Sequence, residues 1–455
     1  MQLRSIIGAL ALMALFLSIG CDPPLPGSSL PQGNEVGPVQ THLAPNAKAS
    51  LPTSGEVLVV GGVSGSNKST AKAEFFNPAT RKWTKTGSMA TPRAGETAVI
   101  VTLGLAHPLV LVSGGFNGKS RLAKLVQHIT GSALSSEELY DPASGKFTGT
   151  GALSATRVGL TATVFPSGPL AGKVLLAGGA DSSGTPLNTA DIFNPATGTT
   201  TPTVNNMTSA RAFHTATLLG NGTVLLAGGA MDHSDNLTPT ADIFHPLTST
   251  FSPTSNSMFE ARGAHAAADV GSGLTERVLI TGGVASGGIG TLFTSNSAEL
   301  YNPATKMFAS ISSMHDTRAF QSATVLSDGR VLIAGGFNGT ALLMGGVLSF
   351  PIGITLNTAE IYDPGANTFT CVGANNSGGC SPSMGFGRAG HTATLFTSGP
   401  LNKDVLIAGG LGGRKPRAKA TELKTSEVFD PSTGKFKGAG NMTTVRGLFA
   451  AALLP

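Results

Sequence analysis

Seven arginines and seven acidic residues recur at equivalent places along this 455-residue chain, and such pairs could act as general acids and bases. A catalytic pair, however, needs one special environment that separates two pKa values, and seven similar copies do not provide it. Buried charges persist mainly when they are paired, so we expect repeated structural contacts. The acids are Glu74, Glu138, Asp191, Asp242, Glu299, Glu360 and Glu427, and the arginines are Arg93, Arg157, Arg211, Arg262, Arg318, Arg388 and Arg446.

Three histidines share one place in the repeat, three residues after the arginine: His214, His265 and His391. They are either a ligand-binding or metal-binding set, or structural histidines whose polar atoms are satisfied inside the protein. Equivalent positions in a ring of repeats are too far apart for the ~2 Å bonds that one shared metal ion requires. We therefore predict no metal site and no cofactor. In the other copies this place holds Glu96, Leu160, Gln321 and Phe449.

Two of the three cysteines lie close together, on either side of a polar stretch that contains glycine. In an exported protein, the spacing of Cys371 and Cys380 predicts a disulfide that closes a small loop. The spacing is not that of a zinc knuckle, and no pair of histidines accompanies it, so a metal site here is disfavoured.

Residues 1–20 combine Arg4 with an apolar stretch from Ile6 to Ile19, which is typical of a secretory signal and too short for a membrane-spanning helix. The segment from Leu17 to Cys21 resembles the lipobox of bacterial lipoproteins, although Ser18 stands three places before the cysteine. The resemblance implies that Cys21 is acylated and anchors the exported protein to a bacterial membrane, in the periplasm or at the cell surface. The alternative is an ordinary cleaved signal. Residues 21–54 then form a tether rich in proline, glycine and serine.

Composition excludes some classes of partner. Charged residues make up only 12% of the chain, about half the usual ~25%. The net charge is +5, but with one Trp and three Tyr there is no visible stacking surface interleaved with basic residues. We therefore predict that the protein does not bind nucleic acid.

Residues 55–455 repeat one unit with a period near the ~50 residues expected of propeller blades. Each unit has an apolar run ending in Gly-Gly, then an acidic residue, two apolar residues and a turn with proline. One unit predicts strands at 214–219, 223–227, 241–244 and around Phe251, which make four antiparallel strands. The Gly-Gly pairs begin at Gly61, Gly114, Gly178, Gly228, Gly282, Gly335 and Gly409.

The Gly-Gly pair, the turn with proline, a following aromatic residue, and a methionine with an arginine together resemble the kelch repeat. The resemblance covers residues 55–455 and implies an all-β, seven-bladed kelch-type propeller, similar to exported kelch-repeat lipoproteins of bacteria. The C-terminal strand, Gly447 to Leu454, should complete the first blade from inside and close the ring. The inner strands carry small residues, and no bulky plug of the channel is evident. In blade three, Thr200 stands where the other blades have an aromatic residue.

The loops after the Gly-Gly strands should emerge on one face, and they differ in charge. Blades seven, one and two are neighbours and carry basic residues, whereas blades three and four carry Asp181, Asp232 and Asp235. Blade six adds a long apolar loop from Ala341 to Leu356, which could contact a partner. The candidate ligand-binding residues are Lys119, Arg121, Lys124, Arg414, Lys415, Arg417, Lys419, Met344 and Phe350; Lys68, Lys72 and Lys424 extend the basic sector.

We expect a monomeric binding or interaction module of the cell envelope that recognises an anionic glycan or another envelope protein through this face. The alternative is a carbohydrate-active enzyme of the isomerase or oxidase type, which the kelch resemblance also implies, with a site at the channel mouth near His214, His265 and His391. The tyrosines Tyr140, Tyr301 and Tyr362 all occupy the repeated turn position, so a tyrosine-cysteine cofactor is disfavoured. A purely structural envelope protein is the third possibility.

Overall fold

The computed structural model describes residues 55–65, 68–102, 105–120, 129–230, 236–286, 291–344, 347–373, 379–413 and 421–455. The regular structure of this part is almost entirely β, with two short 3₁₀ helices, η2 (Gly273–Thr275) and η3 (Gly399–Leu401). No helix among these residues is long and apolar enough to cross a membrane.

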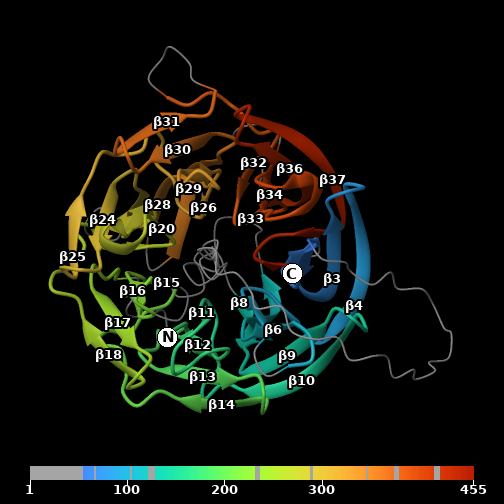
Figure 1. Cartoon of the computed structure of the whole chain (residues 1–455). Coiled ribbons are helices and arrows are strands. Elements are labelled where there is room, and N and C mark those ends of the chain that lie inside the picture. The colour runs from blue at the N-terminus through green and yellow to red at the C-terminus, as the bar shows by residue number, and fades with distance from the viewer. Residues whose placement is uncertain are drawn as a thin grey trace.

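Seven antiparallel units of four strands each, here called blades one to seven, stand in a ring in the described part of the chain (Figure 1); the units of blades one and seven belong to larger sheets that include additional strands. The propeller fold predicted from the sequence is thus confirmed. The strands of each blade are given from the innermost to the outermost. Blade one has β38 (Ala450–Leu453), β1 (Val57–Val60), β3 (Lys68–Asn77) and β4 (Lys82–Arg93); blade two has β5 (Thr97–Val101), β6 (Leu109–Ser113), β9 (Ser136–Asp141) and β10 (Lys146–Ala152); blade three has β11 (Thr161–Val164), β12 (Val174–Ala177), β13 (Ala190–Asn194) and β14 (Thr199–Pro202); blade four has β15 (Thr215–Leu218), β16 (Val224–Ala227), β17 (Ala241–His245) and β18 (Thr250–Pro253). Blade five has β20 (Ala266–Val270), β21 (Arg277–Thr281), β24 (Ala298–Asn302) and β25 (Met307–Ser310); blade six has β26 (Ser322–Val325), β27 (Val331–Ala334), β30 (Ala359–Asp363) and β31 (Thr368–Cys371); blade seven has β33 (Thr392–Leu395), β34 (Val405–Ala408), β36 (Thr421–Asp430) and β37 (Lys435–Arg446).

The second strand of each blade is buried on both faces, because every blade packs between two others. Strand β1 has the sequence Val-Leu-Val-Val, and all four residues are buried. Alternation of polar and apolar residues appears in the outer strand β4, which exposes Lys82 and Lys85 but buries Trp83 between them, and in innermost strands such as β15, Thr-Ala-Thr-Leu. Uninterrupted runs of β-branched and aliphatic residues therefore mark the second strand of each blade.

The C-terminal strand β38 closes the ring by pairing with β1, as predicted, with Ala450 opposite Val60. Two backbone hydrogen bonds continue the pairing beyond the strands, from Gly55 N to Leu454 O and from Leu454 N to Glu56 O, each 2.8 Å long. The innermost edge of blade one is thus supplied by the other end of the chain.

Additional short strands extend one end of the blades. Strand β7 pairs with both β8 and β3, which joins blades two and one, and β23 pairs with β28, which joins blades five and six. The segment predicted as an apolar loop of blade six in fact lies in two paired strands, β28 and β29, in which Leu343 is opposite Leu348 and Met344 is opposite Val347. These strands are β2 (Val63–Ser64), β7 (Phe116–Ser120), β8 (Ile129–Ala133), β19 (Arg262–Gly263), β22 (Val284–Ser286), β23 (Thr291–Thr294), β28 (Phe337–Met344), β29 (Val347–Thr355), β32 (Gly387–Ala389) and β35 (Leu411–Gly413).

The Gly-Gly pair at Gly228 and Gly229 shows why the repeat requires two glycines. Their φ angles are +65° and +105°, which residues other than glycine rarely adopt. An added Cβ would lie 2.6 Å from the carbonyl oxygen of Arg262 at the first glycine and 2.6 Å from that of Ala212 at the second. Both conformation and space therefore exclude a larger residue.

The aromatic residue of the outer strand packs on its own blade and on the preceding one. Phe251 lies 5.0 Å from Phe244 of the same blade, measured between ring centroids, and shares a buried cluster with Ala190 of blade three. In four other interfaces an alanine and a phenylalanine occupy the same two places. Between blades seven and one the pair is Ser426 and Trp83, and the indole N–H donates to the serine hydroxyl at 3.0 Å.

Blade three fills the missing aromatic place with a hydrogen bond. Thr200 lies opposite Phe193 in the sheet, and its hydroxyl donates to Glu137 of blade two at 2.5 Å. Glu137 stands where five other blades have alanine, and it also accepts a hydrogen bond from Ser113 at 2.9 Å. The change of residue on one side of this interface is thus matched by a change on the other.

The pairing predicts a double-mutant result. Thr200→Phe alone should destabilise the protein, because the ring would meet the buried Glu137 carboxylate. Adding Glu137→Ala recreates the usual alanine–phenylalanine pair and should recover about 1–3 kcal/mol of coupling energy in urea denaturation. The exposed Thr201→Phe serves as the control, since its effect should not depend on residue 137. Additive effects of the two changes would contradict this account of the interface.

Candidate functional site

The seven recurrent arginines are fully buried, and each pairs with the acid of the blade that it leads into. In blade four, Arg211 Nη2 lies 2.6 Å from Asp242 Oδ2, while Nη1 donates to the carbonyl oxygens of Gly228 and Thr240. The other pairs, with their N–O distances, are Arg93–Glu138 (2.8 Å), Arg157–Asp191 (3.0 Å), Arg262–Glu299 (3.0 Å), Arg318–Glu360 (2.8 Å), Arg388–Glu427 (2.7 Å) and Arg446–Glu74 (2.9 Å).

The same carboxylates accept backbone N–H groups from the loop that leads into the blade. Glu138 accepts from Ala90 N at 2.7 Å and from Thr91 N at 3.2 Å, directly after the buried Met89. This methionine stands four positions before Arg93, so the carboxylate binds both the loop and the guanidinium. The spacing of methionine and arginine therefore has a structural role, and the recurring arginine–acid pairs are structural contacts, as predicted from their repetition.

The arginine backbone connects each blade to the preceding one. The carbonyl oxygen of Arg262, which leads into blade five, accepts from Gly229 N of blade four at 2.8 Å. Its guanidinium donates to the carbonyl of Gly282 in blade five at 2.7 Å. Each Gly-Gly pair is thus bound by two consecutive arginines. These contacts leave the charged groups without access to a substrate.

The three predicted channel-mouth histidines are buried rather than open to solvent, with exposed fractions of 0% for His214 and His265 and 3% for His391. Each Nε2 atom contacts a hydroxyl of the preceding blade. The distances are 3.0 Å from His214 to Thr161, 2.9 Å from His265 to Thr215 and 2.9 Å from His391 to Ser322. Burial, together with the nearby Arg388, lowers the pKa of His391 to about 3. They are neutral contacts between blades.

Glu96 occupies the corresponding place in blade two and is also buried, with an exposed fraction of 2%. Its carboxyl group packs against Gly61 of blade one, where an added Cβ would overlap it. Burial raises its pKa to about 8, although Arg93 and a backbone hydrogen bond from Ala450 oppose the rise. A carboxyl that favours its neutral form therefore faces the blade in which the ring closes.

One end of the ring axis is packed with apolar side chains, contrary to the expectation that no bulky plug is present. Phe213, Phe320 and Leu448 occupy equivalent places two residues after the arginine, are 2–3% exposed and belong to one buried cluster with residues of all seven blades. Backbone hydrogen bonds connect such places in successive blades, for example from Phe213 N to Gly159 O and from Phe320 N to Ala264 O. The sequence did not reveal this because the residues look like ordinary strand-entry positions.

The predicted basic face is described only in part. Lys68, Lys72 and Lys424 are exposed on the extended strands β3 and β36. Strand β7 lies beside β3 in such a register that Lys119 is directly opposite Lys68. This juxtaposition joins two blades and was not apparent from the sequence, since no local pattern indicates it. The predicted ligand residues Arg121, Lys124, Arg414, Lys415, Arg417 and Lys419, and the predicted acids Asp232 and Asp235, lie outside the described residues.

Other predicted site residues are placed as follows. Met344 and Phe350 lie in β28 and β29, where the backbone but not the side chains is described at these positions. Asp181 was predicted on the acidic side of the loop face; its carboxylate accepts backbone N–H groups of Ser183 and Thr185 within its own loop. Cys21, with the predicted signal and tether, lies outside the described residues.

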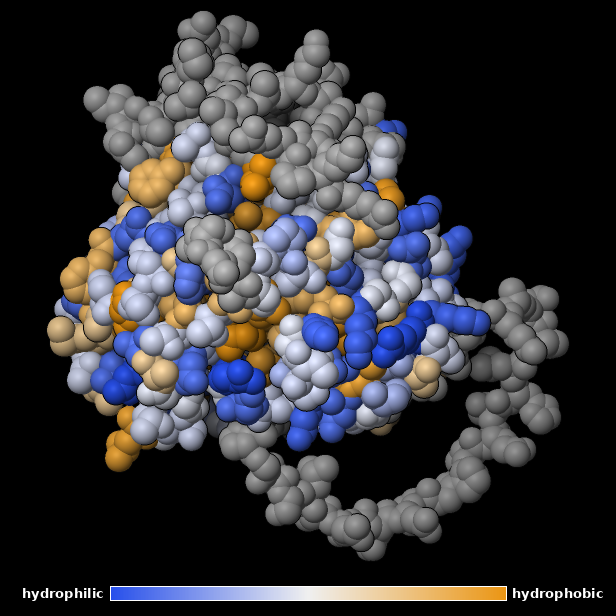
Figure 2. Space-filling view, turned by 90° about the horizontal axis from the view of Figure 1, so that it is seen from above, coloured by the Kyte–Doolittle hydropathy of each residue, from blue (hydrophilic) through white to orange (hydrophobic). Residues whose placement is uncertain are grey.

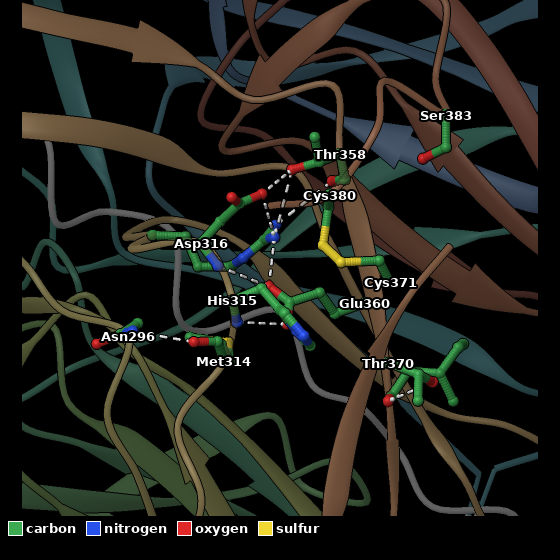
Figure 3. The surroundings of a disulfide bond; sticks show 12 residues. Asn296, Met314, His315, Asp316, Thr358, Glu360, Thr370, Cys371, Cys380 and Ser383 are labelled. Carbon is green, nitrogen blue, oxygen red and sulfur yellow. Dashed lines mark hydrogen bonds and ion pairs between the residues drawn. A yellow bond between two sulfur atoms is a disulfide. The ribbon is translucent and has the colours of Figure 1, made fainter. Parts of the chain in front are cut away.

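Cys371 and Cys380 form a disulfide, with their Cα atoms 5.1 Å apart. Sequence reasoning missed the side chains around it. His315 and Asp316, from the loop leading into blade six, lie beside the disulfide together with Glu360 (Figure 3). A signal was available, because this histidine follows Met314 in the same repeat that carries the cysteine pair.

Comparison with known proteins agrees with the architecture. Residues 49–90 and 318–375 match the Kelch motif. Among solved structures, the chain is similar to the one titled "Structure of YjhT", with 15% sequence identity and a TM-score of 0.50, over 77% of this chain and 98% of that chain. This likeness shows the fold alone. The search of curated proteins found no match.

The buried ion pairs predict that removing one partner of a pair destabilises the protein more than replacing both partners. Arg211→Met leaves Asp242 charged and buried, and should cost about 3–5 kcal/mol in urea denaturation. Arg211→Met combined with Asp242→Leu should recover part of this loss. Lys437→Met is the control, because Lys437 is 58% exposed and lies 3.8 Å from Asp430, and it should cost about 0–1 kcal/mol. Equal losses for Arg211→Met and Lys437→Met would refute the structural role.

Glu96 predicts a pH dependence of stability. Its pKa is near 8 in the folded protein and lies above the unfolded value of 4.5, so its contribution is fully present below about pH 4.5 and is lost as the pH rises through about 8. From about pH 6 to about pH 9, Tm should therefore fall less in Glu96→Gln than in the unaltered protein. Glu96→Leu, which copies Leu160 of blade three, should behave like Glu96→Gln. Parallel curves of Tm against pH would contradict the assignment.

Proposed function

We propose that this kelch-repeat β-propeller protein is a binding module that captures an anionic glycan on the face formed by β2, β3, β7, β8, β35 and β36. A propeller packed from buried, repeated contacts provides a rigid frame, and the strands added to blades seven, one and two are where its copies differ. The proposal rests on the positive charge that these strands bring together.

The observation that carries the proposal is the cross-strand pair of Lys68 and Lys119. Like charges directly opposite one another on neighbouring strands cost about 0.2–1 kcal/mol. A sulfate, phosphate or carboxylate group bound between them would turn this repulsion into attraction. Two lysines held by strands of different blades therefore form the centre of an anion-binding surface.

Further charges surround this pair. Lys72 lies on the same strand as Lys68, and Lys424 lies on the corresponding strand of blade seven. Among the described residues, none of these three lysines takes part in an ion pair. Figure 2 shows hydrophilic residues gathered on the right of the molecule, the side on which Figure 1 places β3, β4 and β37. We include Arg121, Lys124, Arg414, Lys415, Arg417 and Lys419 in the same surface.

The hairpin β28–β29 supplies the second part of the proposed site. It stands at blade six, which neighbours the basic sector through blade seven, and its sequence is largely apolar around Met344 and Phe350. Charges would steer an anionic chain to the face, and apolar contact with sugar rings would hold it. An envelope protein with an acidic and an apolar patch would fit the same surface. Export and attachment through Cys21 complete the proposal and would expose this face to the cell envelope.

The test is binding of the soluble domain that starts near residue 54 to immobilised neutral and anionic glycans at low and high salt. Anionic glycans should bind, and the affinity should fall as salt rises because the attraction is screened. Lys68→Ser combined with Lys119→Ser should weaken binding several-fold without lowering Tm, since removal of their repulsion does not destabilise the sheet. Surface plasmon resonance gives the affinities.

Lys306→Ser is the matched control, because Lys306 is an exposed lysine on the turn of blade five. It changes the net charge but not the proposed face, so binding should stay unchanged. Equal losses for the control and the double variant would indicate a non-specific effect of charge and would contradict the site. Lack of binding to every anionic glycan would overturn the glycan proposal in favour of a protein partner.

A further inference from the structure

Two sulfur atoms, one imidazole and two carboxylates gather at the Cys371–Cys380 disulfide of blade six (Figure 3). The two Sγ atoms and a ring nitrogen of His315 all lie within 4.8 Å of one another. Asp316, Glu360 and the Sγ of Cys380 satisfy the same limit. Potential metal ligands from the loop leading into blade six, from β30, from β31 and from the segment after β31 therefore lie close together.

The loop that carries the histidine is firmly positioned. Glu360 accepts hydrogen bonds from His315 N at 2.8 Å and from Asp316 N at 3.2 Å, and its Oε2 lies 3.0 Å from His315 Nδ1. Asp316 in turn accepts from the hydroxyl of Thr358 at 2.6 Å. The imidazole is thus held beside the sulfur atoms by contacts that do not involve them.

The cluster is open on one side. The side chain of His315 is 38% exposed, while Cys380 is 8% exposed. An ion in solution can therefore reach the imidazole and the sulfur atoms without unfolding of the blade.

The combination occurs in a single copy of the repeat. At the place of His315, directly after the methionine or leucine of the loop, the other copies carry Ala90, Ser154, Thr208, Phe259, Gly385 and Thr443. None of these repeats contains a cysteine. The only histidine at this place thus coincides with the only pair of cysteines in the propeller, although neither is needed for the repeated contacts of the fold.

We propose that reduction of the disulfide converts Cys371, Cys380 and His315 into a binding site for one divalent metal ion that prefers sulfur and nitrogen ligands, such as Zn²⁺. Three protein ligands and one open position, taken by water or by Asp316, suit tetrahedral zinc. Bonds of about 2.3 Å to sulfur and about 2.0 Å to nitrogen place the ligand atoms about 3.5–3.8 Å apart. This spacing lies within the limit that the cluster already meets, once the two sulfur atoms are no longer bonded.

The conversion takes two steps, reduction of the disulfide and binding of the metal ion by the two thiols. The S–S bond accepts two electrons and two protons from a dithiol reductant, which becomes a disulfide itself. The metal ion then replaces the two thiol protons, so two sulfur–metal bonds form and two protons pass to water. The carboxylate of Glu360 supports the imidazole as carboxylates commonly support metal-bound histidines. The two cysteines stay joined in both states, first through a covalent bond and then through the ion.

The test uses Co²⁺ as a spectroscopic probe of the site, in the full-length chain carrying Cys21→Ser so that only these two thiols remain. The protein is reduced, freed of reductant without oxygen, and titrated with Co²⁺. We expect sulfur-to-cobalt charge-transfer bands and the visible bands of tetrahedral cobalt, which saturate at one ion per chain and disappear when Zn²⁺ is added. The oxidised protein should show none of these bands.

His315→Ala should weaken Co²⁺ binding at least a hundredfold, because loss of even an outer-shell partner costs about 10–100-fold in affinity. His107→Ala, at an exposed histidine of blade two, should bind like the parent. Tm of each reduced protein without metal shows whether His315→Ala is still folded. Absence of the cobalt bands in the folded, reduced parent overturns the proposal, as does an unchanged affinity in folded His315→Ala.

Discussion

The buried pair of arginine and carboxylate, repeated in every blade, is the contact on which the rest of the propeller depends. A guanidinium removed from water is costly unless it is paired with an opposite charge and hydrogen-bonded. Here Asp242 and two backbone carbonyls, one of which belongs to the Gly-Gly pair, accept hydrogen bonds from Nη1 and Nη2 of Arg211. The carboxylate holds the incoming loop, the guanidinium holds the strand end, and the arginine backbone holds the preceding blade. The Gly-Gly pair seen in the sequence is the partner of the arginine in this contact, since only glycine leaves room for the arginine backbone.

Between the blades, the structure follows pairing rules that tolerate exceptions only on both sides at once. Alanine packs against phenylalanine, Ser426 accepts a hydrogen bond from the indole N–H of Trp83, and Glu137 accepts one from the hydroxyl of Thr200. Nearer the axis, a histidine contacts a threonine or serine hydroxyl, or Glu96 faces the closing blade. Contacts between blades thus account for these polar residues that differ from one repeat to the next. Polar residues that remain outside such contacts, such as Lys68 and His315, are therefore the better indicators of function.

The fold could be predicted from the sequence because its signals are local and repeated. Gly-Gly, the proline turn and the arginine each mark one place in the blade, and a period near 50 residues fixes how the blades follow one another. The carboxylate partner of each arginine could not be assigned, because both the same blade and the next one were compatible with the spacing. For a related reason, the sequence left open whether the histidines form a ligand-binding set at the channel mouth or structural contacts inside the protein. Sequence shows that His214 recurs with His265, but only packing shows that their side chains point between blades and that Phe213 fills the axis.

The pairing of β38 with β1 has a consequence for biosynthesis. Blade one begins the propeller in the sequence, yet its innermost strand is the last to be made, so the first blade is also the last to be completed. Until residues 450–453 emerge, β1 presents an open edge on its axial side while six later blades form behind it. When the chain is synthesised from its N-terminus, ring closure therefore joins the first and the last strand of the described propeller. A chain that stops short by a few residues would leave not a smaller propeller but an open one, with a free strand edge at its centre.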